Sequence, residues 1–287
     1  MRSTRIAAAV AGAVMLVGSL SACQDDGGKA AGSGSGGGGS SDAAGGKQDP
    51  AQNPVDALKA AQEATSGKKT AQIDGTTDTT TPRGRLKQST KGGLDWTHGM
   101  QMNVSNTVSG GGSPGKPVKA IYTKDAVYMN MSAVMPGMGG KPWMKYSYEA
   151  LSKGLGGSGT LFQDVLQNAD PSQPIELLIA SGTAKAVGKE SVNGVQATHY
   201  TGTVTMDQLS DKASKSVRDL VQKQLAKGGA KSEQLDVWID DHNLLVKKVE
   251  KLGGKQPSSS TALFSDYGAT VDLTPPPAGR TATAPGA

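Results

Sequence analysis

The sequence has a single cysteine, only two phenylalanines and no uncharged apolar run long enough to cross a membrane. One cysteine excludes an intramolecular disulfide, so packing alone must stabilise the fold. The longest such run, from Ile6 to Leu20, is shorter than the roughly 20 residues that a spanning helix needs. The formal net charge is +5, with acids and bases mixed along the chain. We therefore expect neither a transmembrane helix in the mature protein nor the basic footprint of a nucleic-acid-binding protein.

The first 22 residues have the layout of an export signal, with two arginines, the apolar run and then small residues. The run LSAC, which ends at Cys23, resembles the lipobox of bacterial lipoproteins, in which cleavage leaves the cysteine first and diacylated. This resemblance implies that residues 1–22 are a lipoprotein signal peptide and that Cys23 is the lipid attachment residue. Two or more acyl chains hold a protein on a bilayer stably, whereas one chain is marginal.

Residues 23–49 contain the cysteine and then mostly Gly, Ser, Ala and Asp. Such a composition offers too few apolar side chains to offset the entropy of ordering, so a flexible tether is expected. A coil of about 26 residues places the next domain on average roughly 30 Å from its anchor. We expect a protein held by its lipid on the extracytoplasmic face of the cell membrane.

Residues 50–275 lack a second low-complexity break and are expected to form a single domain. The proline-rich end, residues 276–287, is expected to be disordered. A clear local signal is Asn53 before Pro54, which is typical of a helix start, with Gly67 as its stop. Periodicity predicts helices over residues 53–67, 161–169, 174–181 and 207–227, and strands over residues 70–79, 84–92, 99–108, 118–132, 143–147, 183–206, 234–243, 244–252 and 260–268.

Three of these segments carry more specific signals. Asn193 and Gly194 predict a hairpin turn within the strand region 183–206. The helix over 207–227 has an apolar stripe that includes Leu220, and the polar turn DDHN from Asp240 to Asn243 separates two closing strands. Strands interrupted by segregated helices indicate an α+β fold with a largely antiparallel sheet.

The closing strands resemble a known family. LDVWIDDHNLLVKKVE followed by FSDYGATVDLTPPPA is similar to the C-terminal part of the actinobacterial lipoproteins of the LppX and LprG type. The resemblance implies a LolA-like half-barrel, in which an antiparallel sheet curls around a few helices. It also implies an apolar cavity that takes the acyl chains of a lipid or glycolipid, and a role in lipid or lipoprotein trafficking.

A methionine-rich segment, residues 127–146, is the local feature that fits such a cavity. Methionine is unbranched and polarizable, so Met-rich surfaces accommodate ligands of variable shape, although methionine is also a common core filler. The segment contains several glycines and prolines and makes a poor strand. We predict that four methionines lie near the cavity mouth: Met129, Met131, Met135 and Met138.

Motifs for catalysis and metal binding are weak. GGSPG matches G-x-S-x-G but lacks a preceding apolar strand, and Pro114 opposes the required elbow. GLGGSG, from Gly154, lacks the surrounding parallel unit of a nucleotide site. His98, His199 and the DDHN turn show no metal-ligand spacing. We therefore expect no catalytic residues, no metal and no cofactor.

Two functions remain open on the sequence. The first is a lipid-anchored protein, expected to be a monomer, that binds or carries a hydrophobic, lipid-like molecule at the cell envelope. The second is a structural or interaction lipoprotein on the same fold, with its interior filled by side chains, that docks envelope partners without a ligand. Neither function involves catalysis or nucleic acid.

Overall fold

The computed structural model describes residues 53–82, 84–137, 140–154, 166, 169–209, 213 and 215–284. Cys23, Met138 and most of the helix predicted over 161–169 lie outside these residues.

One sheet of twelve strands forms the body of the protein, in the order β12-β6-β5-β4-β3-β2-β1-β11-β10-β9-β8-β7. Neighbouring strands are antiparallel except for β12, which runs parallel to β6. The strands are β1 (Thr70–Thr81), β2 (Gly84–Asp95), β3 (Gln101–Gly110), β4 (Ser113–Tyr122), β5 (Ala126–Asn130), β6 (Trp143–Ser147), β7 (Lys185–Val192), β8 (Val195–Thr205), β9 (Ser232–Asp240), β10 (Leu245–Leu252), β11 (Ser258–Ser265) and β12 (Thr281–Thr283). The sheet is curled and open, with β12 and β7 at its edges, which confirms the predicted α+β class.

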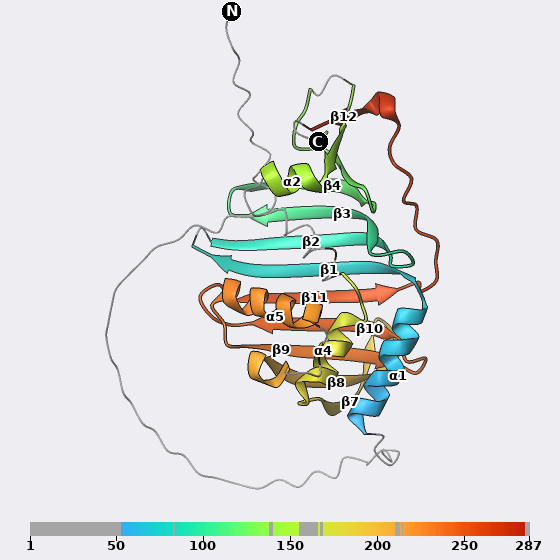
Figure 1. Ribbon diagram of the computed structural model, residues 1–287, viewed down its shortest axis with the longest axis vertical. Helices are drawn as coiled ribbons and strands as arrows, with labels where there is room; N and C mark the ends of the chain where they lie inside the picture. Colours follow the sequence, from blue (N-terminus) through green and yellow to red (C-terminus); the bar gives the residue numbers. More distant parts are fainter. Residues whose placement is uncertain are drawn as a thin grey trace, which may run out of the picture.

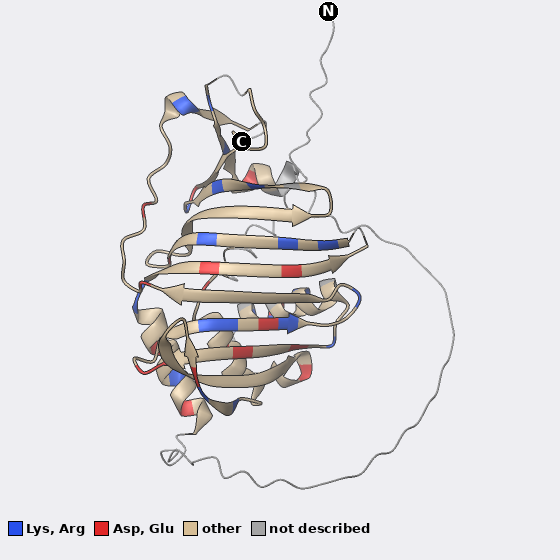
Figure 2. Ribbon diagram, turned by 180° about the vertical axis from the view of Figure 1, so that it is seen from behind, with Lys and Arg blue, Asp and Glu red and all other residues tan. Residues whose placement is uncertain are grey.

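The described helices are α1 (Pro54–Gly67), α2 (Tyr148–Gly154), α4 (Gln173–Ser181) and α5 (Lys215–Gly228), with short 3-10 turns η1 (Met206–Leu209) and η2 (Ala278–Arg280). Helices α1, α4 and α5 lie over the half of the sheet that contains β7 to β11 (Figure 1). Seen from behind, the described strands lie in front of these helices (Figure 2). None of the described helices has the length and hydropathy that a membrane crossing requires.

Helix α1 begins and packs as its sequence predicts. The Asn53 side chain accepts a hydrogen bond of 3.1 Å from the Val55 N–H, which satisfies one free donor of the first turn. Leu58 and Ala61 are fully buried and belong to the same core as residues of α4, α5 and the sheet. This capped helix confirms the predicted segment 53–67.

The helix predicted over 207–227 begins later than expected. Residues 206–209 form η1, Ala213 lies in a bend, and α5 starts at Lys215. The predicted apolar stripe is nevertheless present, because Val217, Val221 and Leu225 recur at every fourth position and are all buried. The structure does not describe the side chain of Leu220.

Both predicted turns are confirmed. Asn193 and Gly194 have φ values of 49° and 84°, as a two-residue hairpin turn requires, and they join β7 to β8. In the DDHN turn the Asp240 carboxylate accepts hydrogen bonds from the N–H groups of His242 (2.9 Å) and Leu244 (2.8 Å). Asn243 adopts a φ of 61° there, so turn chemistry accounts for this polar run.

Two predictions of local structure differ from the structure. The strand predicted over 118–132 is divided, because Thr123 closes a turn between β4 and β5 by hydrogen bonding the Ala126 carbonyl. The end of the chain, expected to be disordered from residue 276, forms η2 and β12. Pairing with the free edge of β6 explains this order, and the Ala284 N–H donates to the Lys145 carbonyl (2.9 Å).

Candidate functional site

The helix-covered face of the sheet begins with a buried apolar row. Cross-strand pairing sets residues in rows across the sheet, and the alternation of side chains puts every second row on this face. This first row, mostly buried, consists of Ala71, Leu94, Met102, Tyr122, Val127 and Tyr146. Apart from Ala71, its members pack in one core with residues of α1, α4 and α5, which identifies the face as the helix-covered one.

The next row on this face mixes small and apolar residues. It consists of Phe264, Ile73, Gly92, Val104, Ala120, Met129, Met144 and Ala282, and we call it the small row. One row further, Gly75 lies between Ala262 and Thr90. Glycine and alanine rise little above the backbone, so the sheet surface is low at Gly75, Gly92 and Ala120. A low surface leaves more room for material packed on it than leucines or phenylalanines would.

Beyond the small row the same face carries polar side chains, together with Val108 and Val118; we call the residues Thr77, Gln88, Thr90, Asn106 and Ser260 the polar rows. All five residues are half-buried. The Thr90 hydroxyl donates to the Asn106 side chain (2.7 Å), and the Thr77 hydroxyl donates to that of Ser260 (3.2 Å). The face therefore becomes more polar along the strand direction, which suits the two ends of an amphipathic molecule.

The four predicted methionines occupy different environments. Met129 is a half-buried member of the small row, and Met131, directly after β5, is buried. Met135 is 38% exposed, and Met138 lies outside the described residues. The loop is fixed at Met131, whose N–H donates to the Pro142 carbonyl (2.8 Å) and whose carbonyl accepts from the Met135 N–H (2.7 Å). Their placement at a cavity mouth stays a prediction.

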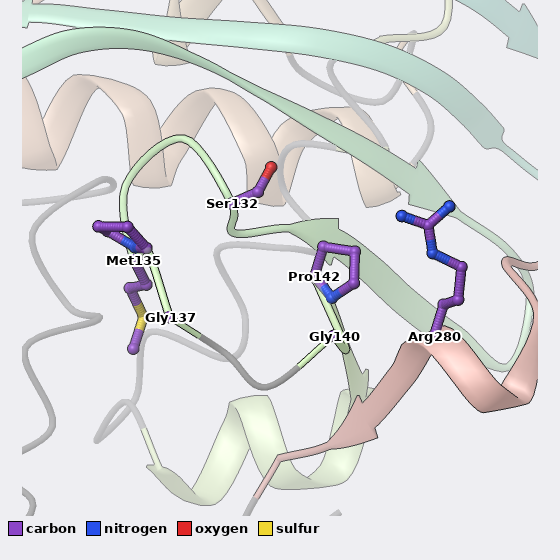
Figure 3. Close-up of a pocket in the computed structure, with 7 residues that line it drawn as sticks. Ser132, Met135, Gly137, Gly140, Pro142 and Arg280 are labelled. Carbon is purple, nitrogen blue, oxygen red and sulfur yellow. The ribbon is translucent and has the colours of Figure 1, made fainter.

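A shallow pocket of about 350 Å³ lies beside this loop. It is lined by Ser132, Met135, Pro136, Gly137, Gly140, Pro142 and Arg280. Figure 3 shows Ser132 and Arg280 on either side of Pro142, with both side chains extending in the same direction. Arg280 comes from η2, so the C-terminal segment completes a pocket that begins in the β5–β6 loop.

Charged residues are buried on the helix-covered face at β9 and β10. Lys248 and Glu250 form an ion pair of 2.8 Å with largely buried side chains. Glu233 is 5% exposed, and its Oε2 has no hydrogen-bond partner in the described part of the chain. The pKa of Glu233 is raised to about 8, mainly by burial and also by the Glu250 carboxylate, while the Lys248 ammonium opposes the shift. A protonated Glu233 is thus the form that the folded protein favours at neutral pH.

Glu233→Gln is expected to remove a pH dependence of stability. In the wild type the free energy of unfolding should fall as pH rises from 4.5, the ordinary pKa, to about 8, because the unfolded chain loses its proton while the folded chain keeps it. Near pH 8 the variant should be the more stable protein by on the order of 2 kcal/mol. Urea unfolding across this range measures the effect, with exposed Glu63→Gln as control. Parallel pH profiles for wild type and Glu233→Gln would contradict the assignment.

The opposite face of the sheet carries a hydrogen-bonded histidine cluster. The two ring nitrogens of His199 lie 3.0 Å from Glu190 Oε1 and 3.0 Å from Asp236 Oδ1. The His199 ring stacks on Trp238 with 4.1 Å between centroids, and the Trp238 indole N–H donates to Glu190 Oε2 (2.9 Å). This hydrogen bond lowers the pKa of Glu190, and His199 adds to the effect. Both imidazole nitrogens are engaged by carboxylates, as suits a structural cluster.

The other residues that the sequence offered for catalysis or metal binding lie apart from this histidine cluster. The Ser113 hydroxyl, from GGSPG, donates to the Val108 carbonyl (2.7 Å) within the β3–β4 hairpin. In the DDHN turn, His242 Nδ1 lies 3.9 Å from Asp240 Oδ2. Within the described ranges there is no group of three His, Cys, Asp or Glu side chains that could hold a metal ion.

Two Streptomyces proteins are similar to the chain over most of its length. An uncharacterized 31.2 kDa protein of Streptomyces griseus is 39% identical over 243 residues, which cover 80% of this chain and 78% of that protein. A protein of Streptomyces coelicolor, named as a candidate lipoprotein, is 32% identical over 240 residues, or 79% of this chain and 74% of that protein. The chain belongs to this Streptomyces family. No family model matches it.

Solved structures with a similar course of the chain include two mycobacterial lipoproteins. LprF of Mycobacterium bovis has a TM-score of 0.49 and 14% identity, covering 78% of this chain and 96% of its own. LppX of Mycobacterium tuberculosis has a TM-score of 0.48 and 16% identity, covering 77% of this chain and 98% of its own. LppX is one of the lipoproteins that the closing strands resemble. That resemblance implied a half-barrel, and the curled, largely antiparallel sheet of this protein has that architecture.

Proposed function

We propose that the protein is a lipoprotein anchored through Cys23 on the extracytoplasmic face of the cell membrane, and that it binds an amphipathic lipid on the helix-covered face of its sheet. The observation that carries the ligand proposal is the change on this face from the apolar and small rows to the polar rows. The LSAC motif and the candidate lipoprotein of Streptomyces coelicolor support the anchor.

The arrangement gives such a lipid a preferred orientation. Acyl chains gain about 0.8 kcal/mol for each buried CH₂, so ten methylenes over the small row would gain about 8 kcal/mol before entropic costs. Polar groups of the same molecule would reach Thr77, Gln88 and Asn106, whose side chains can donate and accept hydrogen bonds. A ligand placed the other way round would leave these polar side chains under hydrocarbon, which costs free energy.

A binding role fits the chemistry of the described side chains better than a catalytic one. The His199 imidazole is held between two carboxylates, and the Ser113 hydroxyl is engaged by a backbone carbonyl within a hairpin. A nucleophile needs a base within hydrogen-bond reach and room for a substrate, and these two residues do not form such a pair. We therefore propose a carrier or binding protein rather than an enzyme.

A second candidate function is an interaction module without a ligand. It is favoured by two exposed apolar side chains in the β7–β8 hairpin, Val187 on the edge strand β7 (54% exposed) and Val195 at the start of β8 (43% exposed). Exposed apolar side chains on an edge strand can pair with a partner protein. This role would use the opposite end of the sheet from the β5–β6 loop that contains Met135.

Thr90→Trp is expected to reduce ligand binding. Thr90 lies next to Gly75 on the helix-covered face, so an indole there would fill the space above the low part of the sheet. Its neighbour Lys91 points to the other face, and Lys91→Trp removes only an exposed ion pair with Asp74. Mass spectrometry of lipid extracted from the mature chain should show at least a fivefold lower lipid content for Thr90→Trp than for Lys91→Trp. Equal lipid content in the two variants, with both folded, would exclude this face as the binding site.

A further inference from the structure

The β12 edge of the sheet brings Arg280 beside a segment, distant in the sequence, that contains Lys141 and Lys145. Thr281 pairs with Trp143 and Thr283 pairs with Lys145 in the parallel β12–β6 ladder. This register sets Arg280 beside Pro142, the residue that follows Lys141. All three cations, Lys141, Lys145 and Arg280, are exposed. We call these residues, together with Met135 and Pro136, the β12 surface.

The positive charge of the β12 surface is not balanced nearby. The sequence has no Asp or Glu from residue 126 to 148 or from residue 273 to 287, the two segments that build this edge. Exposed lysines elsewhere do have acidic partners, as Lys91 does in Asp74 and Lys215 does in Asp219. Among the described residues, no carboxylate pairs with Lys141, Lys145 or Arg280. The edge is therefore complementary to a negatively charged surface.

An apolar element accompanies these cations. Met135 is one of only three large apolar side chains exposed in the described part of the chain, and it lines the same pocket as Arg280. Exposed cations next to an apolar side chain are the combination that binds the surface of an anionic bilayer. Cations attract the phosphate groups, while the apolar side chain enters the boundary between headgroups and acyl chains.

We propose that the β12 surface docks on a bilayer that contains anionic phospholipid. The segment from Cys23 to the start of α1 is long enough for an anchored protein to place this edge on the membrane. About 30 extended residues span at most about 100 Å. Twelve strands at about 4.8 Å spacing make a sheet roughly 50 Å wide. In Figure 1, α1 lies toward the β7 end of the sheet and β12 at the opposite end. An anchor attached before α1 therefore still permits the far edge to lie on the membrane. Docking would bring Met135 and Pro136 to the bilayer surface.

Vesicle flotation tests this surface with the mature chain, residues 23–287, carrying Cys23→Ser so that an acyl anchor does not dominate binding. The protein should bind vesicles with equal parts of phosphatidylcholine and phosphatidylglycerol, and it should dissociate as salt is raised, because screening weakens surface attraction. Each basic residue near an anionic surface is worth about 1 kcal/mol, so Lys141→Glu with Arg280→Glu should weaken binding about 30-fold or more.

The matched control reverses two exposed lysines away from this edge, Lys87→Glu with Lys185→Glu, and changes the net charge equally. It should weaken binding to a smaller extent, within about threefold of wild type. Equal losses in the two double variants, or equal binding to vesicles of phosphatidylcholine alone, would overturn the proposal. The result is separable from ligand binding, since Thr90→Trp should leave vesicle flotation unchanged.

Discussion

Val221→Asp is expected to unfold the domain or to lower its free energy of unfolding by about 4 kcal/mol or more. Val221 is fully buried on α5 and packs in the main core with residues of the sheet. A carboxylate there would lose its hydration without gaining a partner, which is among the most costly single changes. Since domains have a total stability of about 5–15 kcal/mol, most of the margin would be lost.

Thermal and urea unfolding of the mature chain measure this effect. Gln222→Asp is the matched control, because the next residue of α5 is exposed and gains the same charge. Its stability should stay within about 0.5 kcal/mol of wild type. If both variants melted at the wild-type temperature, α5 would not be packed against the sheet as described.

Cys23→Ala is expected to eliminate acylation of the protein. Cys23 carries the only thiol of the chain, and the LSAC run resembles the lipobox that directs transfer of a diacylglyceryl unit to such a thiol. Two acyl chains bury many methylenes at about 0.8 kcal/mol each, so their loss changes membrane partition by orders of magnitude. The intact mass of the protein purified from its own cells should include the lipid in wild type and lack it in Cys23→Ala.

The control for this experiment is Gln24→Ala, which follows the cysteine and leaves LSAC intact. It should carry the same lipid as wild type and begin at the same residue. An identical, unmodified mature N-terminus in wild type and Cys23→Ala would contradict the lipoprotein assignment.

Local signals in the sequence were sufficient for several elements of the fold. The capped start of α1 at Asn53, the Asn193–Gly194 turn and the DDHN turn each depend on residues within a few positions of one another. The stripe on α5 was also predictable, because burial of Val217, Val221 and Leu225 follows helical periodicity. Such features are encoded by short-range spacing, which one sequence displays directly.

Features that depend on pairing between distant segments could not be predicted in this way. β12 is ordered because Thr281–Thr283 find the free edge of β6, and no local pattern in a proline-rich tail shows this. The small row joins residues of eight strands and the polar rows join residues of four, so both follow only from the register between strands. Glu233 resembles an ordinary exposed acid in the sequence, yet pairing of β9 places it beneath the helices with 5% exposure. The basic β12 surface likewise joins Arg280 to Lys141 only through the parallel ladder.

The most direct test of the central claim is native mass spectrometry of the mature chain purified from its own membranes under gentle conditions. The account predicts a complex with one amphipathic lipid besides the anchor, which Thr90→Trp loses and Lys91→Trp retains. Apo protein alone in all three samples, even after incubation with total membrane lipid, would contradict the claim and favour the interaction module.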